Sequence, residues 1–154
     1  MYSFIVNPNA SGGRGERIWR RLEKQLKHLG VPYEAFVTEK TGDARRLACD
    51  LTEHQREPRI LIAVGGDGTV SEVLDGISFC GPVTLGYIPT GSGNDLARSL
   101  RLPKSPSRCL KKILNPKYHK LLDYGVLSYG DHLTHRRFMV STGIGMDAMV
   151  CQDI

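Results

Sequence analysis

The sequence predicts an α/β fold, with a doubly wound and mostly parallel sheet that carries helices on both faces, followed by a β hairpin. Short apolar runs alternate with segments of helical periodicity as far as Pro116. Three of these runs end in turns rich in small residues, as strands of α/β sheets do. After Tyr118 the pattern changes to two β-rich runs joined by a short turn, which is typical of a hairpin.

The expected strands are short apolar segments that turns or helices separate. They cover residues 2–7, 33–38, 59–64 and 83–88. The segment 59–64 is apolar after its first residue, as expected of a strand buried on both faces of a parallel sheet. Two further strands, over residues 120–129 and 136–142, are expected to form the hairpin around Gly130.

The expected helices show apolar residues at helical spacing or begin at a good capping residue. They cover 16–29, 43–54, 69–76, 95–100 and 105–116. Asp43 and Ser105 are expected to cap their helices, with Pro106 in the first helical position. Thr69 and Glu72 have the spacing of a capping box. Together with the change of pattern after Tyr118, these elements predict an α/β domain over residues 1–119 and the start of a second, β-rich part over 120–154.

Composition narrows the class of protein. The chain has 154 residues, 40% of them hydrophobic, and no apolar run approaches the ~18 residues of a membrane-spanning helix. The start does not resemble a secretory signal. The four cysteines form no CxxC pair, and the five histidines lack metal-ligand spacing, so neither a zinc site nor a disulfide framework is expected. Reduced thiols in a cytoplasm are the preferred interpretation.

The net charge of +5 leaves two interpretations open. Basic residues occur on the 16–29 helix and again around the helix that precedes Pro116. Such residues often form a solvated helix face, and they can also attract nucleic acid, an anionic membrane or phosphate groups.

The segment Gly65-Gly66-Asp67-Gly68-Thr69 carries the strongest functional signal. It joins a buried strand to a helix, so its backbone N–H groups are expected to point at one spot beside the positive end of a helix dipole. We expect its glycines to take positive φ or to approach a ligand closely. Phosphate suits such a spot, and Asp67 could hold a magnesium ion that bridges phosphates. The alternative is a turn that only ends a strand and caps a helix.

Two further loops follow strands in the same way. Residues 89–95, with Gly91, Asn94 and Asp95, precede a helix, and Asp95 would place a second carboxylate near Asp67. A helix cap is the alternative there. Residues 7–15 form a third loop of small residues, which is weak evidence alone. No Gly-Lys pair exists, which excludes a P-loop, and the G-x-G-x-x-A match at 143–148 lacks the βαβ context of a dinucleotide site.

Taken together, these motifs resemble the catalytic domain of the diacylglycerol kinase family, in particular its soluble bacterial lipid kinases. That group is related to sphingosine kinases and more distantly to NAD kinases and phosphofructokinases. The resemblance rests on Asn7-Pro8, the 65–69 motif, Glu72 and the segment Gly91-x-x-Asn94-Asp95-x-Ala97-Arg98, and it covers nearly all of residues 1–150. It implies an ATP-dependent enzyme that transfers the γ-phosphoryl group to the hydroxyl of diacylglycerol or a related lipid.

The resemblance also implies roles for residues and partners. ATP would be bound by Asn7, Pro8, Ser11, Thr38, Gly65, Gly66, Asp67, Gly68, Thr69, Glu72, Thr90, Gly91, Ser92 and Asn94. Asp67 and Asp95 are the expected catalytic carboxylates and Mg²⁺ ligands, directly or through water. Asp43 departs from the family, where histidine is frequent, and Ser92 replaces a usual threonine. The expected location is the cytoplasm and the membrane surface, in lipid metabolism and phospholipid biosynthesis.

Members of the family continue into a β-sandwich domain that supplies the general base and much of the lipid pocket. Residues 121–150 resemble its opening strands, so we expect this chain to bind nucleotide but to be inactive alone. Its hairpin is expected to be mobile or to pair with a second copy in a homodimer. Three alternatives remain: an NAD kinase-like enzyme, a non-catalytic nucleotide-binding fragment, and a basic protein that binds nucleic acid through its charge. Under the preferred interpretation, nucleic acid is not an expected partner.

Overall fold

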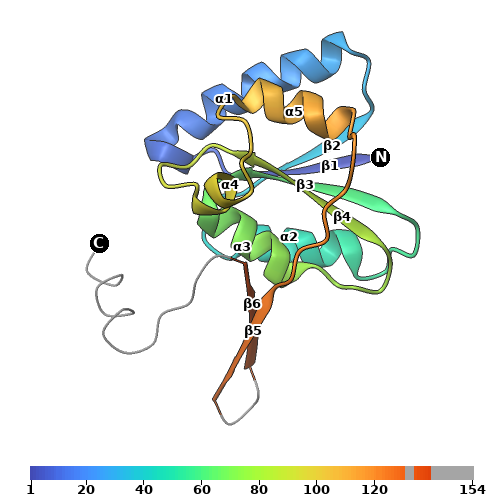
Figure 1. Ribbon diagram of the computed structural model, residues 1–154, viewed down its shortest axis with the longest axis vertical. Helices are drawn as coiled ribbons and strands as arrows, with labels where there is room; N and C mark the ends of the chain where they lie inside the picture. The colour runs from blue at the N-terminus through green and yellow to red at the C-terminus, as the bar shows by residue number, and fades with distance from the viewer. Residues whose placement is uncertain (131–133, 140–154) are drawn as a thin grey trace.

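The computed structural model describes residues 1–130 and 134–139. Its main sheet has four parallel strands in the order β2-β1-β3-β4 (Figure 1). The strands are β1 (Tyr2–Val6), β2 (Tyr33–Val37), β3 (Arg59–Gly65) and β4 (Val83–Pro89). All four expected strands of the α/β domain are confirmed within one or two residues. Because they run parallel, their carboxyl ends meet at one edge of the sheet.

Helices cover both faces of this sheet. They are α1 (Ala10–His28), α2 (Asp43–Thr52), α3 (Asp67–Gly76), α4 (Asp95–Ser99) and α5 (Pro106–Leu114). Helices α1 and α5 lie together on one face, and α2 and α3 lie on the other (Figure 1). The doubly wound architecture predicted from the sequence is therefore confirmed.

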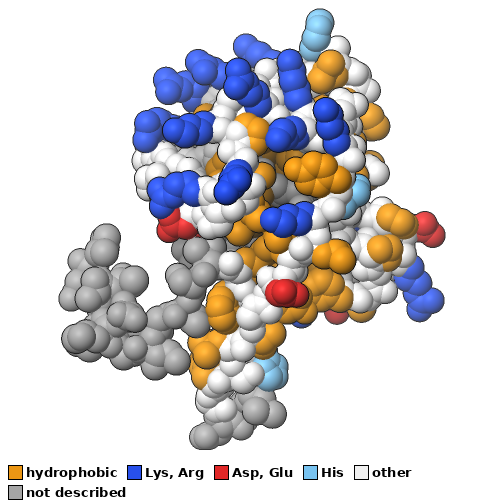
Figure 2. All heavy atoms as spheres, viewed as in Figure 1, with side chains coloured by type: hydrophobic (Ala, Val, Ile, Leu, Met, Phe, Trp, Pro, Cys, Tyr) orange, Lys and Arg blue, Asp and Glu red, His pale blue; other side chains and the backbone are white. Residues whose placement is uncertain are grey.

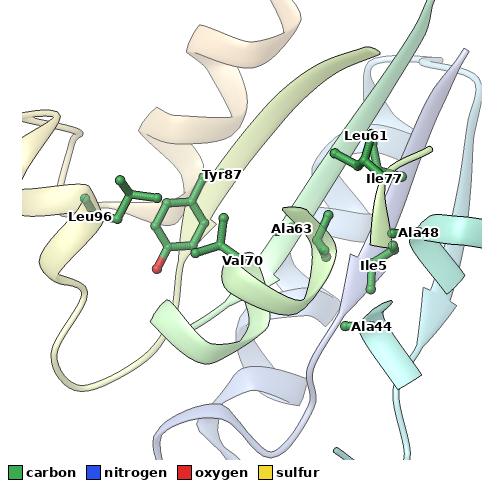
Figure 3. Packing of buried hydrophobic residues seen from close by; sticks show 11 residues of the cluster. Ile5, Ala44, Ala48, Leu61, Ala63, Val70, Ile77, Tyr87 and Leu96 are labelled. Atoms are coloured by element: carbon green, nitrogen blue, oxygen red, sulfur yellow. The ribbon is translucent and has the colours of Figure 1, made fainter. Parts of the chain in front are cut away.

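The core is split between the two faces by the alternation of side chains along each strand. On one face, Phe4 and Ile62 are fully buried beneath Trp19 and Leu22 of α1. On the other face, Ile5, Leu61 and Ala63 pack against α2 and α3, with Ala44 and Val70 among their neighbours (Figure 3). Burial of a large apolar side chain stabilises the fold by ~1.5–3 kcal/mol. Because such side chains pack on both faces, the core holds the four strands in one arrangement, and with them the edge of the sheet at which the loops meet.

Two helix caps expected from the sequence are wrong. Helix α2 is capped by Gly42 in a left-handed conformation, with Asp43 as its first residue, and α3 is capped by Gly66, three residues before Thr69. Thr69 thus lies inside the first turn of α3, and its pairing with Glu72 in a capping box does not form. Ser105 does occupy the cap position of α5, with Pro106 next to it, but its side chain makes no capping hydrogen bond.

The hairpin consists of β5 (Gly125–Tyr129) and β6 (Thr134–Phe138), which pair antiparallel. Its first strand begins five residues later than expected, while the expected residues 140–142 and the 143–148 motif lie outside the described part of the chain. The hairpin contacts the end of α3, where Arg137 donates to the carbonyl of Ile77 at 2.5 Å. The Arg137 guanidinium also lies over the ring of Phe79, 4.8 Å from its centroid. Among the described residues no helix is long and apolar enough to cross a membrane.

Basic side chains gather over α1 and α5 (Figure 2). Helix α1 carries six Lys or Arg residues and two acidic ones, and α5 carries three basic residues and no acidic one. Together the two helices have a net charge of +7, whereas the whole chain has +5. The fold therefore joins two groups of basic residues, about eighty positions apart in the sequence, into one basic face.

Candidate nucleotide-binding site

Three loops follow the carboxyl ends of β1, β3 and β4, which are neighbours in the sheet. They comprise residues 7–15, 65–69 and 89–95, the same segments that the sequence singles out. The crevice outside the carboxyl ends of parallel strands is where open α/β sheets bind their ligands. Side-chain hydrogen bonds join each of these loops to the other two.

The first loop is tied to the second through Asn7. The Asn7 side-chain amide donates to the hydroxyl of Thr69 at 3.1 Å, and its backbone N–H donates to the carbonyl of Val64 at 2.9 Å. The Thr69 side chain also packs over Gly65, where a Cβ would overlap it. Thr69 therefore joins the start of α3 to the end of β1.

The first loop reaches the third through Ser11. The Ser11 hydroxyl donates to the carbonyl of Thr90 at 2.8 Å. Ser11, Gly12 and Gly13 all have positive φ, and serine in this conformation costs ~1 kcal/mol or more. This turn interrupts regular helix geometry at the start of α1. It brings the hydroxyl of Ser11 across to β4.

Asp67 ties the second loop to the third. Its two carboxylate oxygens accept hydrogen bonds from the backbone N–H groups of Asp95, at 2.9 Å, and Leu96, at 3.1 Å. These are the first two residues of α4, whose N–H groups have no partner within the helix. Asp67, which belongs to the 65–69 loop, thus holds the start of α4. Each of its two carboxylate oxygens keeps a further lone pair. The fold uses Asp67 as a structural acceptor, which the sequence does not reveal.

Positive φ does not explain the glycines of the 65–69 motif, whereas a close approach of two backbones explains Gly91 of the neighbouring loop. Gly65, Gly66 and Gly68 are not among the glycines with positive φ, so that part of the expectation is wrong. A Cβ on Gly91 would lie 2.6 Å from the Cα of Gly66, so these two loops touch through their backbones. A Cβ on Gly68 would meet no heavy atom of the described residues within 4 Å, so packing within this part of the chain does not require glycine there.

The third loop is closed on itself by Asn94. The Asn94 side chain accepts from the N–H of Gly91 at 3.0 Å and donates to the carbonyl of Gly91 at 2.6 Å. Asn94 has a φ of 55°, a conformation that asparagine tolerates better than most residues. Beneath it, the hydroxyl of Tyr87 donates to the Asn94 side chain at 3.4 Å. Burial raises the pKa of Tyr87, so the phenol stays protonated as a donor.

A fourth segment, the loop between β2 and α2, completes the site. Glu72 accepts a hydrogen bond from the N–H of Gly42 at 3.0 Å, so α3 holds this loop as well. Thr38 directly follows β2 and is buried, and its hydroxyl donates to the carbonyl oxygen of Val6 at 3.3 Å. Glu72 and Thr38 thus join the site through structural contacts of their own.

These loops enclose a cavity of about 630 Å³, within the ~300–1,000 Å³ usual for small-molecule sites. Ten residues expected at the site line it: Asn7, Ser11, Thr38, Gly66, Asp67, Gly68, Thr69, Glu72, Gly91 and Ser92. Pro8, Gly65, Thr90, Asn94 and Asp95 do not line it. Sequence reasoning missed further lining residues, namely Asn9, Ala10, Glu39, Lys40, Thr41, Ala44 and Gly93.

The carboxylates of the site differ in their access to the cavity. Asp67 lines the cavity, whereas the Asp95 carboxylate pairs with the guanidinium of Arg98. Over residues 1–130 and 134–139, no group of three or more His, Cys, Asp and Glu side chains is arranged to hold a metal ion. Of the two carboxylates that the sequence proposed as Mg²⁺ ligands, Asp67 therefore lines the cavity and Asp95 does not.

Comparison with known proteins identifies similar sequences and structures. Residues 1–125 match the model of the diacylglycerol kinase catalytic domain. A protein of Bacillus subtilis (strain 168) named "Putative lipid kinase YtlR" is 33% identical over 149 residues, which are 96% of this chain and 48% of that protein. A diacylglycerol kinase of Staphylococcus saprophyticus is 38% identical over 100 residues, which are 64% of this chain and 32% of that protein.

The fold is similar to that of solved structures. The crystal structure of a diacylglycerol kinase from Bacillus anthracis str. Sterne aligns with a TM-score of 0.65 and 28% identity, over 80% of this chain and 42% of that one. The chain thus spans about half or less of the length of these proteins. The matched family model and the shared fold show that the chain belongs to the diacylglycerol kinase catalytic domain family.

Proposed function

We propose that this chain is the nucleotide-binding part of an ATP-dependent lipid kinase, which transfers the γ-phosphoryl group of ATP to the hydroxyl of diacylglycerol or a related lipid. The observation that carries the proposal is the cavity at the carboxyl ends of the parallel strands, enclosed by three mutually bonded loops. Family membership and the lipid kinase names of the relatives support the reaction class.

In this account the backbone of the 65–69 loop binds the phosphates. Gly66 and Gly68 line the cavity at the N-terminus of α3, where free N–H groups and the helix dipole favour anions. Phosphoryl transfer depends mostly on positioning and on stabilising charge, which such a cradle supplies. Asp67 would hold the magnesium ion that accompanies ATP. Of the two expected carboxylates we assign that role to Asp67, because it lines the cavity and Asp95 does not. The general base and the lipid pocket are proposed for sequence beyond this chain.

Calorimetric titration of the 154-residue chain with MgATP tests the nucleotide site. We expect saturable binding at one site per chain and none with NAD, which an NAD kinase-like enzyme would bind as its substrate. Two results would support the proposed division between nucleotide binding and catalysis. This chain should bind ATP without transferring phosphate to diacylglycerol, and a chain extended as in its relatives should carry out the transfer. Absence of ATP binding at millimolar nucleotide would contradict the proposal.

The enzyme is further proposed to meet its lipid at a membrane surface. The basic face over α1 and α5 favours this, because clustered Lys and Arg side chains are attracted to anionic lipids, by ~1 kcal/mol for each residue near the surface. Co-sedimentation with vesicles containing phosphatidylglycerol should decrease with salt and with charge-removing changes at Lys111 and Lys112. Equal sedimentation with neutral vesicles would contradict it. Pairing of two copies through β5 and β6 stays a prediction.

A further inference from the structure

A shallow groove runs between α1 and α5, on the basic face of the chain. It has a volume of about 360 Å³ and shares no lining residue with the nucleotide cavity. Regular helix geometry in α1 resumes at Arg14, and the groove begins ten residues further on, at Lys24, which corresponds to ~15 Å along the helix axis. Its lining residues are Lys24, Gln25, His28, Leu29, Leu110 and Lys111. The groove is therefore a separate feature of the surface.

Direct contacts between the two helices hold the walls of the groove. The Gln25 side-chain amide of α1 donates to the hydroxyl of Ser107 on α5 at 3.0 Å. Beneath this bond, Leu26 and Leu110 are buried in the same core cluster. Because both walls are fixed by packing, a ligand would enter the groove without having to reorder the helices.

The groove combines apolar surface with positive charge. Leu110 is almost fully buried and can only form the floor, whereas the Leu29 side chain is 56% exposed. On the same face, apolar side chains lie among the Lys and Arg side chains (Figure 2). Lys24 and Lys111 are exposed, and within residues 1–130 and 134–139 neither forms an ion pair with a carboxylate. The six lining residues include no acidic one.

This combination of groups suits an amphiphilic anion. Ammonium groups attract phosphate, and leucine side chains favour contact with hydrocarbon. A neutral lipid offers no net charge to the lysines, and a free phosphate ester offers nothing to Leu29. An anionic phospholipid offers both groups in one molecule, and the basic face around the groove would attract a membrane that contains it.

We propose that the groove between α1 and α5 binds the headgroup of one anionic phospholipid, with its phosphate between Lys24 and Lys111 and the start of its acyl chains against Leu29. The inference rests on the proposed membrane contact of the basic face. It goes beyond that contact because it assigns a discrete site, with an apolar as well as a charged part. It also goes beyond the kinase reaction, because the lipid in this groove lies away from the nucleotide cavity and is not the substrate.

Titration of the 154-residue chain with monomeric dihexanoyl phosphatidylglycerol tests the groove without a membrane surface. We expect saturable binding at one site per chain. Dihexanoyl phosphatidylcholine, which has no net charge, and glycerol phosphate, which has no acyl chain, should each bind at least about tenfold more weakly. These two compounds separate the contribution of charge from that of apolar contact.

Variants at single positions separate the groove from the charge of the whole face. Lys111→Gln should weaken binding of the monomeric lipid about fivefold, the scale of one lysine at an anionic lipid. Lys112→Gln removes the same charge from the next position, which does not line the groove, and should weaken it less than about twofold. Leu29→Ser keeps the net charge and should weaken binding about fivefold through lost apolar contact.

Equal losses in Lys111→Gln and Lys112→Gln would overturn the groove, because binding would then follow the charge of the face. Wild-type affinity in Leu29→Ser would overturn it too, as would glycerol phosphate binding as tightly as the lipid. ATP binding should be the same in all three variants, because the groove and the nucleotide cavity share no residue. Thermal unfolding confirms that the compared chains are folded.

Co-sedimentation with phosphatidylglycerol vesicles separates this inference from the membrane contact on which it rests. If the wild-type chain sediments with the vesicles but does not bind the monomeric lipid, the membrane contact stands and the groove is contradicted. If it neither sediments nor binds the lipid, both are contradicted.

Discussion

The backbone N–H of Arg137 in β6 donates a hydrogen bond of 2.9 Å to the carboxylate of Asp75 near the end of α3. The same carboxylate contacts the guanidinium groups of Arg136, at 2.7 Å, and Arg45, at 3.1 Å. Helix α3 begins at Asp67 in the glycine loop and ends one residue after Asp75. One helix therefore joins the cavity to the hairpin.

Replacement of Asp75 by alanine should lower the free energy of unfolding by ~2–3 kcal/mol, since hydrogen bonds to a charged group are the stronger kind. The Asp75 side chain is only 9% exposed, so water would replace its partners poorly. Urea denaturation measures the change. Asp50→Ala removes an exposed ion pair with Arg46 and should cost less than ~0.5 kcal/mol. Equal losses in the two variants would contradict this role of Asp75.

The contribution of Asp75 should disappear in acid. Burial alone would raise its pKa, but the hydrogen bonds from Arg136 and from the Arg137 backbone, together with the charge of Arg45, outweigh it and hold the pKa of Asp75 below its usual value. A depressed carboxyl pKa stabilises the fold above the unfolded value of ~3.9, and this stability is lost as pH falls through the folded pKa. The stability difference between wild type and Asp75→Ala should therefore shrink between pH 7 and pH 3. A constant difference across this range would contradict the ion-pair account.

Arg137→Ala should loosen the hairpin while leaving the sheet intact. Its guanidinium donates to the carbonyl of Ile77 and lies over the rings of Phe79 and Tyr124, so it joins β6 to the α/β domain in addition to the bonds that Asp75 makes. Amide hydrogen exchange in residues 125–129 should become faster in this variant, and exchange in β3 should not change. Lys120→Ala, in the exposed connection before the hairpin, serves as control. Unchanged protection of β5 would show that a different contact, such as a second copy of the chain, orders the hairpin.

Asp67→Asn should be destabilising as well as catalytically harmful. Asparagine offers one acceptor oxygen where the N–H groups of Asp95 and Leu96 now meet two. We expect a loss of ~1–2 kcal/mol in the free energy of unfolding and, in a chain extended as in its relatives, at least ~100-fold slower phosphoryl transfer. Asp95→Asn removes only an exposed pair with Arg98 and should change stability by less than ~0.5 kcal/mol. Identical stability of both variants would contradict the structural role of Asp67.

Most of the correct predictions came from two features of the sequence, the periodicity of its apolar residues and the loops that follow its expected strands. Apolar runs locate all four strands of the main sheet, and the rule that ligands bind at the carboxyl ends of strands places the three loops at one edge of that sheet. Applied to the second strand, the same rule would also have found Lys40 and Thr41, because they follow Thr38 at its end.

Contacts between distant residues could not be predicted in this way. Asp75 and Arg137 are 62 positions apart and belong to no motif, and the bond from Glu72 to Gly42 depends on how α3 packs beside α2. The capping-box spacing of Thr69 and Glu72 failed because Gly66 already begins the helix, which leaves both side chains free for tertiary contacts. Local pattern fixes neither the start of a short helix nor the partner of a polar side chain.

The binding of ATP by Gly68→Ala tests the central claim, that the 65–69 loop binds phosphate through its backbone. A Cβ on Gly68 would have no neighbour within 4 Å among residues 1–130 and 134–139, and alanine in the first turn of α3 should leave stability unchanged or raise it by up to ~1 kcal/mol. Gly91→Ala, in contrast, should destabilise the chain by ~1–3 kcal/mol because its Cβ would collide with Gly66. Calorimetry should show at least tenfold weaker ATP binding by the stable Gly68→Ala variant, whereas Ser71→Ala on the same helix should bind like wild type. Wild-type affinity for ATP in Gly68→Ala would contradict the claim.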